Sequence, residues 1–293
     1  MENAGRLLVE YGEQDAEIPI WYIADIHYTN VGCDKKKLLE DIAAIKKNPN
    51  ALWILGGDYC EWIVPGDIRF DPECIDTELK VQDLARYGAL VTQKMLDYFR
   101  SIKGRCLGVL YGNHELAYYT EHQAKYLHDV LCKELGAPNL RYSAFLELYF
   151  KRRKGLKGVR ISRGRVNVAD HKLTVFCHHG FGAATTAGGK MAALKRLVDT
   201  VDADLILMAH LHESLCKVFV RLRVEDGRIH EKPCVAMITG SYLRGWPQGA
   251  TEYTERRGYP PSCLGASYAV YHPADGYLSA KTAARVGRHY YEG

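Results

Sequence analysis

The sequence predicts an α/β fold, and two patterns along the chain carry this prediction. Through the first two-thirds, short apolar runs typical of buried strands alternate with segments whose apolar residues recur at helical spacing. In the last third, short runs separated by turn residues are typical of antiparallel strands. This order predicts a largely parallel sheet packed against a second, mixed sheet.

Five apolar runs predict the strands of the first two-thirds, at 18–24, 51–55, 106–110, 173–177 and 204–208. Helical spacing between them predicts helices over about 38–47, 79–102, 120–135 and 190–201. Asp34 is a plausible N-cap of the first helix. In the last third, strands are predicted at 218–224, 235–238, 266–271 and 277–280, with a turn at 225–227.

The composition excludes several classes of protein. Of the 293 residues, 47% are hydrophobic and 25% are charged, and the formal net charge is only +4. This apolar content excludes a chain that is mainly disordered. The longest apolar runs, of about five residues, are far shorter than the ~20 that span a bilayer. No secretory signal follows Met1, so we expect a cytoplasmic protein with nine reduced cysteines and no membrane segment.

Polar residues with metal-binding chemistry directly follow each of the five apolar runs. They are Asp25 and His27, then Asp58, then Asn113, His114 and Glu115, then His178 and His179, and finally His210 and His212. Because the carboxyl ends of parallel strands line one edge of a sheet, we expect these residues to converge. Any one of these motifs arises by chance in many chains, but five in order after five strands predict a metal site.

The same motifs resemble those of a known family. Asp25-Ile26-His27, Gly57-Asp58, Gly112-Asn113-His114-Glu115, His178-His179 and Ala209-His210-Leu211-His212 look like the five motifs of the calcineurin-like metallophosphoesterases, over about residues 18–213. The resemblance implies a four-layer α/β/β/α sandwich, in which helices flank two mixed β-sheets. It also implies a centre of two divalent metal ions. The family usually has glycine where this chain has Ala209.

The resemblance also implies roles for individual residues. One metal would be held by Asp25, His27 and His212, and the other by Asn113, His210 and one histidine of the 178–179 pair, with Asp58 bridging both. We favour His178 as the ligand because it comes directly off the strand, and we then group His179 with the catalytic residues; the alternative ligand is His179. By resemblance, His114 contacts the phosphate or protonates the leaving oxygen, and Glu115 orients His114.

The donor set also bears on the identity of the metal. Oxygen and nitrogen donors without a thiolate favour Mn²⁺, with Fe or Zn²⁺ as further possibilities. Mg²⁺ is less suited because it disfavours several imidazole ligands.

Candidate substrate contacts lie outside the metal motifs. Tyr28 and Tyr59 directly follow two of the motifs, and Arg244 lies in a loop that could reach the phosphate. The segment Lys151–Arg165 has eight basic residues among fifteen and no acid, which fits a nucleotide or nucleic acid partner or, more simply, a solvated hairpin. The stretch 118–169 is long for a connection, so we expect it to be a specificity insert within a single domain spanning 1–293.

The predicted function is hydrolysis of a phosphoester by a hydroxide that bridges two metal ions. A phosphodiesterase that acts on a nucleotide or nucleic acid is the favoured form. Two alternatives stay open. One is a phosphomonoesterase, including a protein phosphatase, and the other is a non-catalytic scaffold of the same fold. The sequence does not indicate an oligomeric state.

Overall fold

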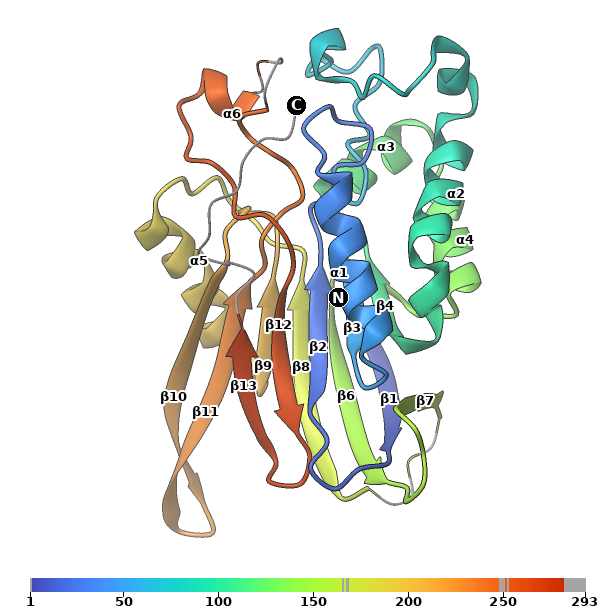
Figure 1. Cartoon of the computed structure of the whole chain (residues 1–293). Helices are drawn as coiled ribbons and strands as arrows, with labels where there is room; N and C mark the ends of the chain where they lie inside the picture. Colours follow the sequence, from blue (N-terminus) through green and yellow to red (C-terminus); the bar gives the residue numbers. More distant parts are fainter. Residues whose placement is uncertain (1, 165, 167–168, 248–250, 252, 282–293) are drawn as a thin grey trace.

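Two mixed β-sheets pack face to face, and helices cover the outer face of each sheet (Figure 1). The structure is a computed structural model, and it describes residues 2–164, 166, 169–247, 251 and 253–281. The arrangement confirms the predicted α/β/β/α sandwich.

The first sheet contains six strands in the order β13-β12-β2-β3-β4-β5. Four of them are parallel, namely β2 (Ile18–Ile23), β3 (Leu52–Gly56), β4 (Cys106–Leu110) and β5 (Asn139–Arg141). The antiparallel pair β12 (Ser267–His272) and β13 (Tyr277–Lys281) completes the sheet. Its outer face packs against α1 (Lys35–Lys47), α2 (Tyr87–Phe99) and α4 (Tyr126–Leu135).

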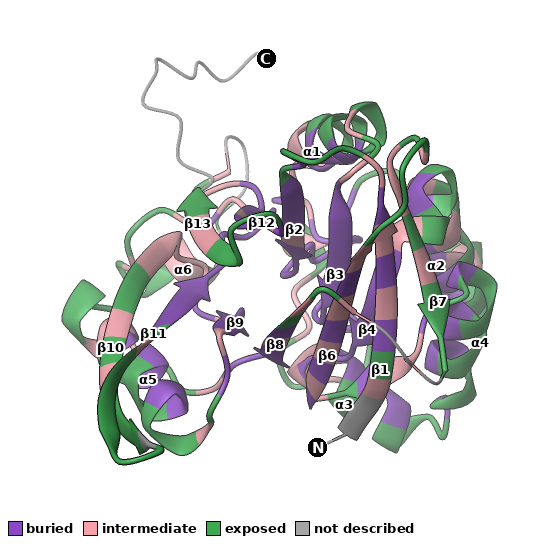
Figure 2. Cartoon of the chain, turned by 90° about the horizontal axis from the view of Figure 1, so that it is seen from below, coloured by how far each residue is buried: buried purple, intermediate pink, exposed green. Residues whose placement is uncertain are grey.

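The second sheet contains seven strands in the order β10-β11-β9-β8-β6-β1-β7. Their bounds are β10 (Leu215–Glu225), β11 (Arg228–Ile238), β9 (Leu205–Met208), β8 (His171–His178), β6 (Ser143–Arg152), β1 (Glu2–Tyr11) and β7 (Val159–Arg163). Helix α5 (Ala187–Thr200) covers its outer face through Leu194 and Leu197. The inner faces of both sheets form one apolar core, and Figure 2 shows the buried strands at the centre.

Short helices lie between these elements. They are α3 (Asn113–Glu121), α6 (Tyr253–Arg256) and the 3₁₀ turns η1 (Pro72–Cys74), η2 (Val81–Arg86) and η3 (Arg100–Arg105). None of the helices among the described residues combines the length and the apolar character that crossing a membrane requires.

Local sequence signals located most elements, although some boundaries differ. The strand at 106–110 matches β4, and the Asp34 carboxylate accepts from the Lys37 N–H at 2.9 Å as the N-cap of α1. The helix predicted over 79–102 is divided into η2, α2 and η3. The helix predicted to begin at 120 is also wrong there, because α3 ends at Glu121, Gln123 has a φ of 51°, and α4 begins at Tyr126.

Through its described residues, the stretch 118–169, where we predicted a specificity insert, contributes strands to both sheets. It supplies β5, β6 and β7, and β6 pairs with β8 on one side and β1 on the other. Alternate residues of β6 are buried between the two sheets, namely Ala144, Leu146, Leu148 and Phe150. This alternation is typical of a half-buried strand.

The basic segment 151–165 begins at the end of the sheet that is remote from the metal motifs. In the antiparallel pair of β6 and β8, Ser143 lies opposite His178, whereas Phe150 lies opposite His171. Arg153 pairs there with Glu10 at 2.9 Å. Arg165 lies outside the described residues. The described part of the segment therefore does not lie beside the metal motifs, as a substrate-holding arm would require.

His128 is a buried titratable group on the inner side of α4. Its ring packs against Tyr59 and Tyr111, and its Nε2 lies 3.1 Å from Asn139 Oδ1. Burial lowers the pKa of His128 to about 4.

We expect this buried histidine to make stability depend on pH. His128 takes up a proton near pH 6.5 in the unfolded chain and only near pH 4 in the folded chain. The free energy of unfolding is therefore highest above about pH 6.5 and decreases as the pH falls toward 4. Urea unfolding in EDTA should show that this decrease in the free energy of unfolding is smaller in His128→Gln than in the unchanged protein, by up to about 3 kcal/mol. The same pH dependence in both proteins would contradict the expectation.

Candidate metal centre

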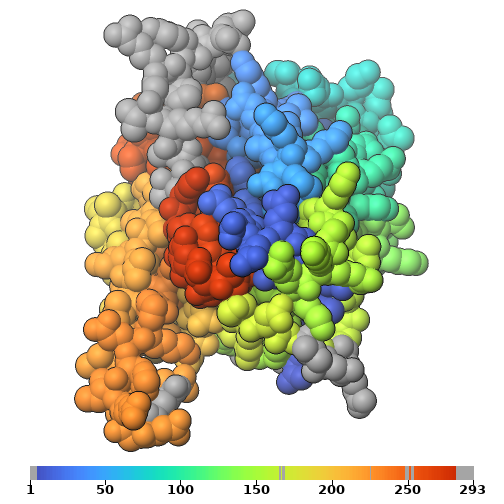
Figure 3. All heavy atoms as spheres, turned by 60° about the horizontal axis from the view of Figure 1, so that its bottom comes forward, coloured from blue at the N-terminus to red at the C-terminus, as the bar shows by residue number. Residues whose placement is uncertain are grey.

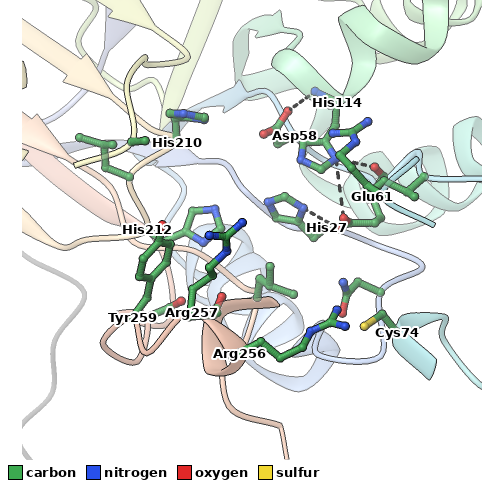
Figure 4. Close-up of a pocket in the computed structure, with 18 of the residues that line it drawn as sticks. His27, Asp58, Glu61, Cys74, His114, His210, His212, Arg256, Arg257 and Tyr259 are labelled. Carbon is green, nitrogen blue, oxygen red and sulfur yellow. Dashed lines mark hydrogen bonds and ion pairs between the residues drawn. The ribbon is translucent and has the colours of Figure 1, made fainter. Parts of the chain in front are cut away.

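The predicted metal motifs lie at the carboxyl ends of five strands, where the two sheets meet. The first sheet brings Asp25 and His27 from β2, Asp58 from β3, and Asn113 and His114 from β4. The second sheet brings the 178–179 pair from β8, and His210 and His212 from β9. Figure 4 shows His27, Asp58, His114, His210 and His212 around one pocket.

Unusual backbone conformations aim the donor side chains. The φ angles are 51° at Asp25, 50° at His27, 47° at Asp58, 72° at His210 and 47° at His212. All five angles lie in the left-handed region and not in the extended conformation of a strand. Each costs on the order of 1–3 kcal/mol and occurs mostly at functional sites.

Bonds between neighbouring strand ends help to hold the strained loops in place. The Asp25 and His27 N–H groups donate to the carbonyls of Gly57 and Asp58, each at 3.0 Å. A Cβ atom at Gly112 would collide with the Asp58 carboxylate and the His179 ring, so this position needs glycine.

Three overlapping groups of side chains could each hold a metal ion. They are Asp25 with His27 and His212, His27 with Asp58 and His114, and Asp58 with His179 and His210. The potential ligand atoms of each group lie within 4.8 Å of one another. Asp58 belongs to two of the groups, as a carboxylate shared between two ions would.

Two buried polar atoms support the fit to metal ions. Asp25 Oδ1 and His27 Nε2 are buried without a hydrogen-bond partner. Buried polar atoms are almost always satisfied, so each exception needs a physical reason. His27 also donates from Nδ1 to Glu61 Oε2 at 2.7 Å, which leaves Nε2 as a ligand atom. This histidine–carboxylate pairing is the usual support of a metal-binding imidazole.

The structure brings His179 rather than the favoured His178 into the cluster. His179 Nε2 lies 3.1 Å from both Asn113 Oδ1 and Asp58 Oδ2, and its Nδ1 lies 2.9 Å from the Gly56 carbonyl. His178 instead accepts from the Gly180 N–H through Nδ1 at 2.8 Å. Side chains alternate along a strand, and Cys177 faces the core between the sheets. His178 therefore points to the outer face, and His179 points to the junction.

Buried carboxylates make this junction attractive to positive charge. Burial alone would lower the pKa of His179, but the nearby Asp58 outweighs burial and raises it to about 9. Burial likewise opposes the charged form of His27, and Glu61 raises its pKa to about 9. Burial would raise the pKa of Asp58, yet the imidazoles of His179 and His114 hold it well below its usual range. A site that draws protons onto imidazoles also favours divalent cations, whose binding releases those protons.

Glu115 has a different position from the one expected. We expected it to orient His114, but its carboxylate accepts from the backbone N–H groups of Asp58 and Gly112, both at 2.7 Å. It also accepts from Tyr59 N–H at 3.0 Å and from Trp62 Nε1 at 2.8 Å. These bonds fix the loop that carries Asp58. Glu115 is fully buried, so its carboxylate does not line the pocket.

Glu61 is the acid beside His114, and the sequence analysis missed it. Its Oε1 lies 3.8 Å from His114 Nδ1, and its backbone carbonyl accepts from the same nitrogen. Since Glu61 also binds His27, one residue orients two imidazoles. Its spacing of three residues after Asp58 was the available signal.

The structure does not place the three expected substrate contacts in the pocket. Tyr28 is buried and packs against Tyr98, and Tyr59 is buried against Tyr119 and Trp62. The Arg244 guanidinium pairs with Asp34, and Arg244 does not line the pocket. These residues contribute to packing and to loop attachment instead.

The donor residues open onto a pocket of about 920 Å³. Three parts of the chain outside the metal motifs form its walls, at 61–75, at 182–190, and at Leu243 together with 254–262. Four cationic side chains line it, namely Arg69, Lys190, Arg256 and Arg257. Arg256 Nη2 lies 3.0 Å from Asp71 Oδ2 and joins two of the walls, while Arg257 points toward His212 (Figure 4). These lining segments carry no motif, so the sequence did not reveal them.

Comparison with protein families identifies the class of protein that this fold and site define. Residues 18–214 match the model of the calcineurin-like phosphoesterases, which is more than half of the chain. The chain therefore belongs to this family of metal-dependent phosphoester hydrolases. No curated protein matches the sequence.

Three solved structures are similar to this chain at low sequence identity. A Streptococcus pneumoniae protein, described as a predicted phosphoesterase, is 11% identical with a TM-score of 0.33, and the match covers 91% of this chain and 98% of that one. A Thermotoga maritima protein is 15% identical with a TM-score of 0.33, over 90% and 99% of the two chains. A double mutant of Vps29 from Entamoeba histolytica is 13% identical with a TM-score of 0.26, over 65% and 88%.

We expect Glu61→Gln to weaken metal binding. The amide can still accept from His27 Nδ1, but it lacks the negative charge that makes this imidazole a strong donor. Titration with Mn²⁺ should show an affinity about 10- to 100-fold lower than that of the unchanged protein. Glu147→Gln, at an acid paired with Lys172 on the surface, is the matched control. Equal affinities for Glu61→Gln and the control would contradict the role of Glu61.

Proposed function

We propose that this protein hydrolyses phosphodiesters at a centre of two metal ions. The observation that carries the proposal is the convergence of five strand-end motifs on one cluster that contains two unpartnered buried donor atoms, Asp25 Oδ1 and His27 Nε2. Asp25, His27 and His212 would hold one ion, and Asn113, His179 and His210 the other, with Asp58 shared. The mixed oxygen and nitrogen donors favour Mn²⁺, then Fe or Zn²⁺. Such a pair of ions supplies a hydroxide nucleophile near neutral pH and offsets phosphoryl charge.

His114 is the residue proposed to move a proton. The Glu61 carbonyl can only accept a hydrogen bond, so His114 Nδ1 carries a hydrogen and is held in place by it. The remaining ring nitrogen, Nε2, is the atom that can give a proton to the leaving oxygen of the ester. His114 lines the pocket, as this role requires.

The pocket supports an anionic substrate with substituents on both sides of the phosphorus. Its volume of about 920 Å³ exceeds the space that a phosphate group alone fills. Its cationic side chains suit negative charge, and Phe70, Tyr259 and Ile63 offer apolar surface for a base or another ring. A nucleotide or a nucleotide-like diester fits this combination. The position of residues 151–164, the described part of the basic segment, adds no support for a long nucleic acid.

We also propose that the protein acts in the cytoplasm. The nine cysteines are present as thiols, which is typical of a reducing compartment. Cell fractionation tests this location, and recovery of the protein outside the cytoplasm would contradict it.

The purified protein loaded with Mn²⁺ is expected to hydrolyse bis(p-nitrophenyl) phosphate faster than p-nitrophenyl phosphate. On a diester with an alkoxide leaving group, His114→Ala should lower kcat by about 100- to 10,000-fold, because the leaving oxygen loses its acid, while the metal content stays unchanged. His230→Ala, at an exposed histidine of β11, is the matched control.

Other outcomes of this experiment would point to the alternatives. Faster turnover of the monoester would favour a phosphomonoesterase. Metal-loaded protein that turns over neither ester with Mn²⁺, Fe, Zn²⁺ or Mg²⁺ would contradict the proposal and favour a non-catalytic scaffold. Full activity of His114→Ala on the diester with the alkoxide leaving group would contradict the assignment of the acid.

A further inference from the structure

The hairpin formed by β10 and β11 extends beyond the rest of its sheet. Its pairing runs from Leu215 opposite Ile238 to Glu225 opposite Arg228, and Asp226 and Gly227 close it with φ angles of 50° and 72°. Strand β9 supports β11 only from Val235 to Ile238. The outer hairpin therefore stands away from the body as a two-stranded ribbon (Figures 1 and 3). A two-stranded ribbon alone is at best marginally stable in water.

One side of this ribbon is an apolar hairpin face, which consists of Val218, Val220, Leu222, Val224 and Ile229. The exposed fractions of these residues lie between 55% and 74%. The four residues of β10 alternate along the strand and so point to the same side, and Ile229 lies opposite Val224. A contiguous row of exposed aliphatic side chains on a soluble protein marks an interaction site.

The reverse side of the ribbon is attached to the body by charge. Arg221 Nη2 lies 3.0 Å from Asp202 Oδ1, and Lys232 Nζ lies 2.8 Å from the same carboxylate. Arg223 also pairs with Asp202, at 3.7 Å. These contacts hold the ribbon in place and leave its apolar hairpin face, on the opposite side, exposed to solvent.

We propose that the apolar hairpin face packs against the same face of a second copy of this chain, across a twofold axis. The face continues the inner surface of its sheet, since Val218 lies opposite Val235, which belongs to the core between the sheets. Two such ribbons stacked face to face would repeat the sheet-on-sheet packing that the protein already uses in its core. The occupant should be apolar, because only Glu231, opposite Leu222, brings a charge to this side.

The area is sufficient for a specific dimer. Burial of these five side chains on both copies would remove about 1,000 Å² of surface from water, which is the size at which specific interfaces begin. A self-complementary patch also suits twofold symmetry, the commonest arrangement of homo-oligomers. The hairpin lies outside the metal pocket, so this inference does not depend on the proposed function.

Sedimentation velocity over a range of micromolar concentrations tests the proposal. We expect the unchanged protein to sediment as a dimer, and Leu222→Glu to weaken self-association by about tenfold or more, because it places a charge at the centre of the face. His230→Glu is the matched control, because His230 lies opposite Arg223 on the reverse side of the same ribbon. Circular dichroism melting curves show whether both variants remain folded.

Three results would overturn the proposal. One is an unchanged protein that stays monomeric at every concentration, and another is a dimer that Leu222→Glu leaves intact. The third is equal dissociation of the folded Leu222→Glu and His230→Glu proteins. If the monomer instead binds phosphatidylcholine vesicles, the apolar hairpin face is a lipid-binding surface and not a dimer interface.

Discussion

Buried negative charge at the junction of the two sheets is the constraint on which the site depends. Asp25 and Asp58 are 0% and 1% exposed, and burial raises the pKa of Asp25 to about 7. Carboxylates removed from water at such a junction need positive charge between them. The imidazoles of His27 and His179 provide part of it as protons, and divalent cations provide it more completely. The five left-handed donor residues and the buried Glu115 hold this arrangement in place.

Each sheet supplies only part of the donor set, so the fold and the site are inseparable. Strands β2, β3 and β4 bring Asp25, His27, Asp58 and Asn113 from one sheet, while β8 and β9 bring the remaining imidazoles from the other. The apolar core between the sheets fixes the spacing of these strand ends. A change in that core would therefore alter ligand geometry without touching a ligand.

The sequence located the strand ends because apolar runs followed by polar residues are local signals. It favoured His178, whereas His179 lies in the cluster, since that outcome depends on which side of β8 faces the other sheet. The positions of Tyr28 and Arg244 likewise depend on the folded chain: Tyr28 packs against Tyr98 and Arg244 pairs with Asp34, and neither reaches the pocket. Glu61 and the cations of the pocket wall come together only in the folded chain. In β6, the alternation of Leu146, Leu148 and Phe150 was readable, but the prediction for 118–169 rested on the length of the stretch and did not use this pattern.

Counting metal ions per chain tests the central claim most directly. After loading with Mn²⁺ and removal of excess metal, elemental analysis should find about two ions in the unchanged protein. It should find about one or fewer in Asp58→Asn, because the shared carboxylate is lost. Asp199→Asn, on the surface of α5, should keep both ions. Well under one ion in the unchanged protein, or two ions retained by Asp58→Asn, would contradict the account.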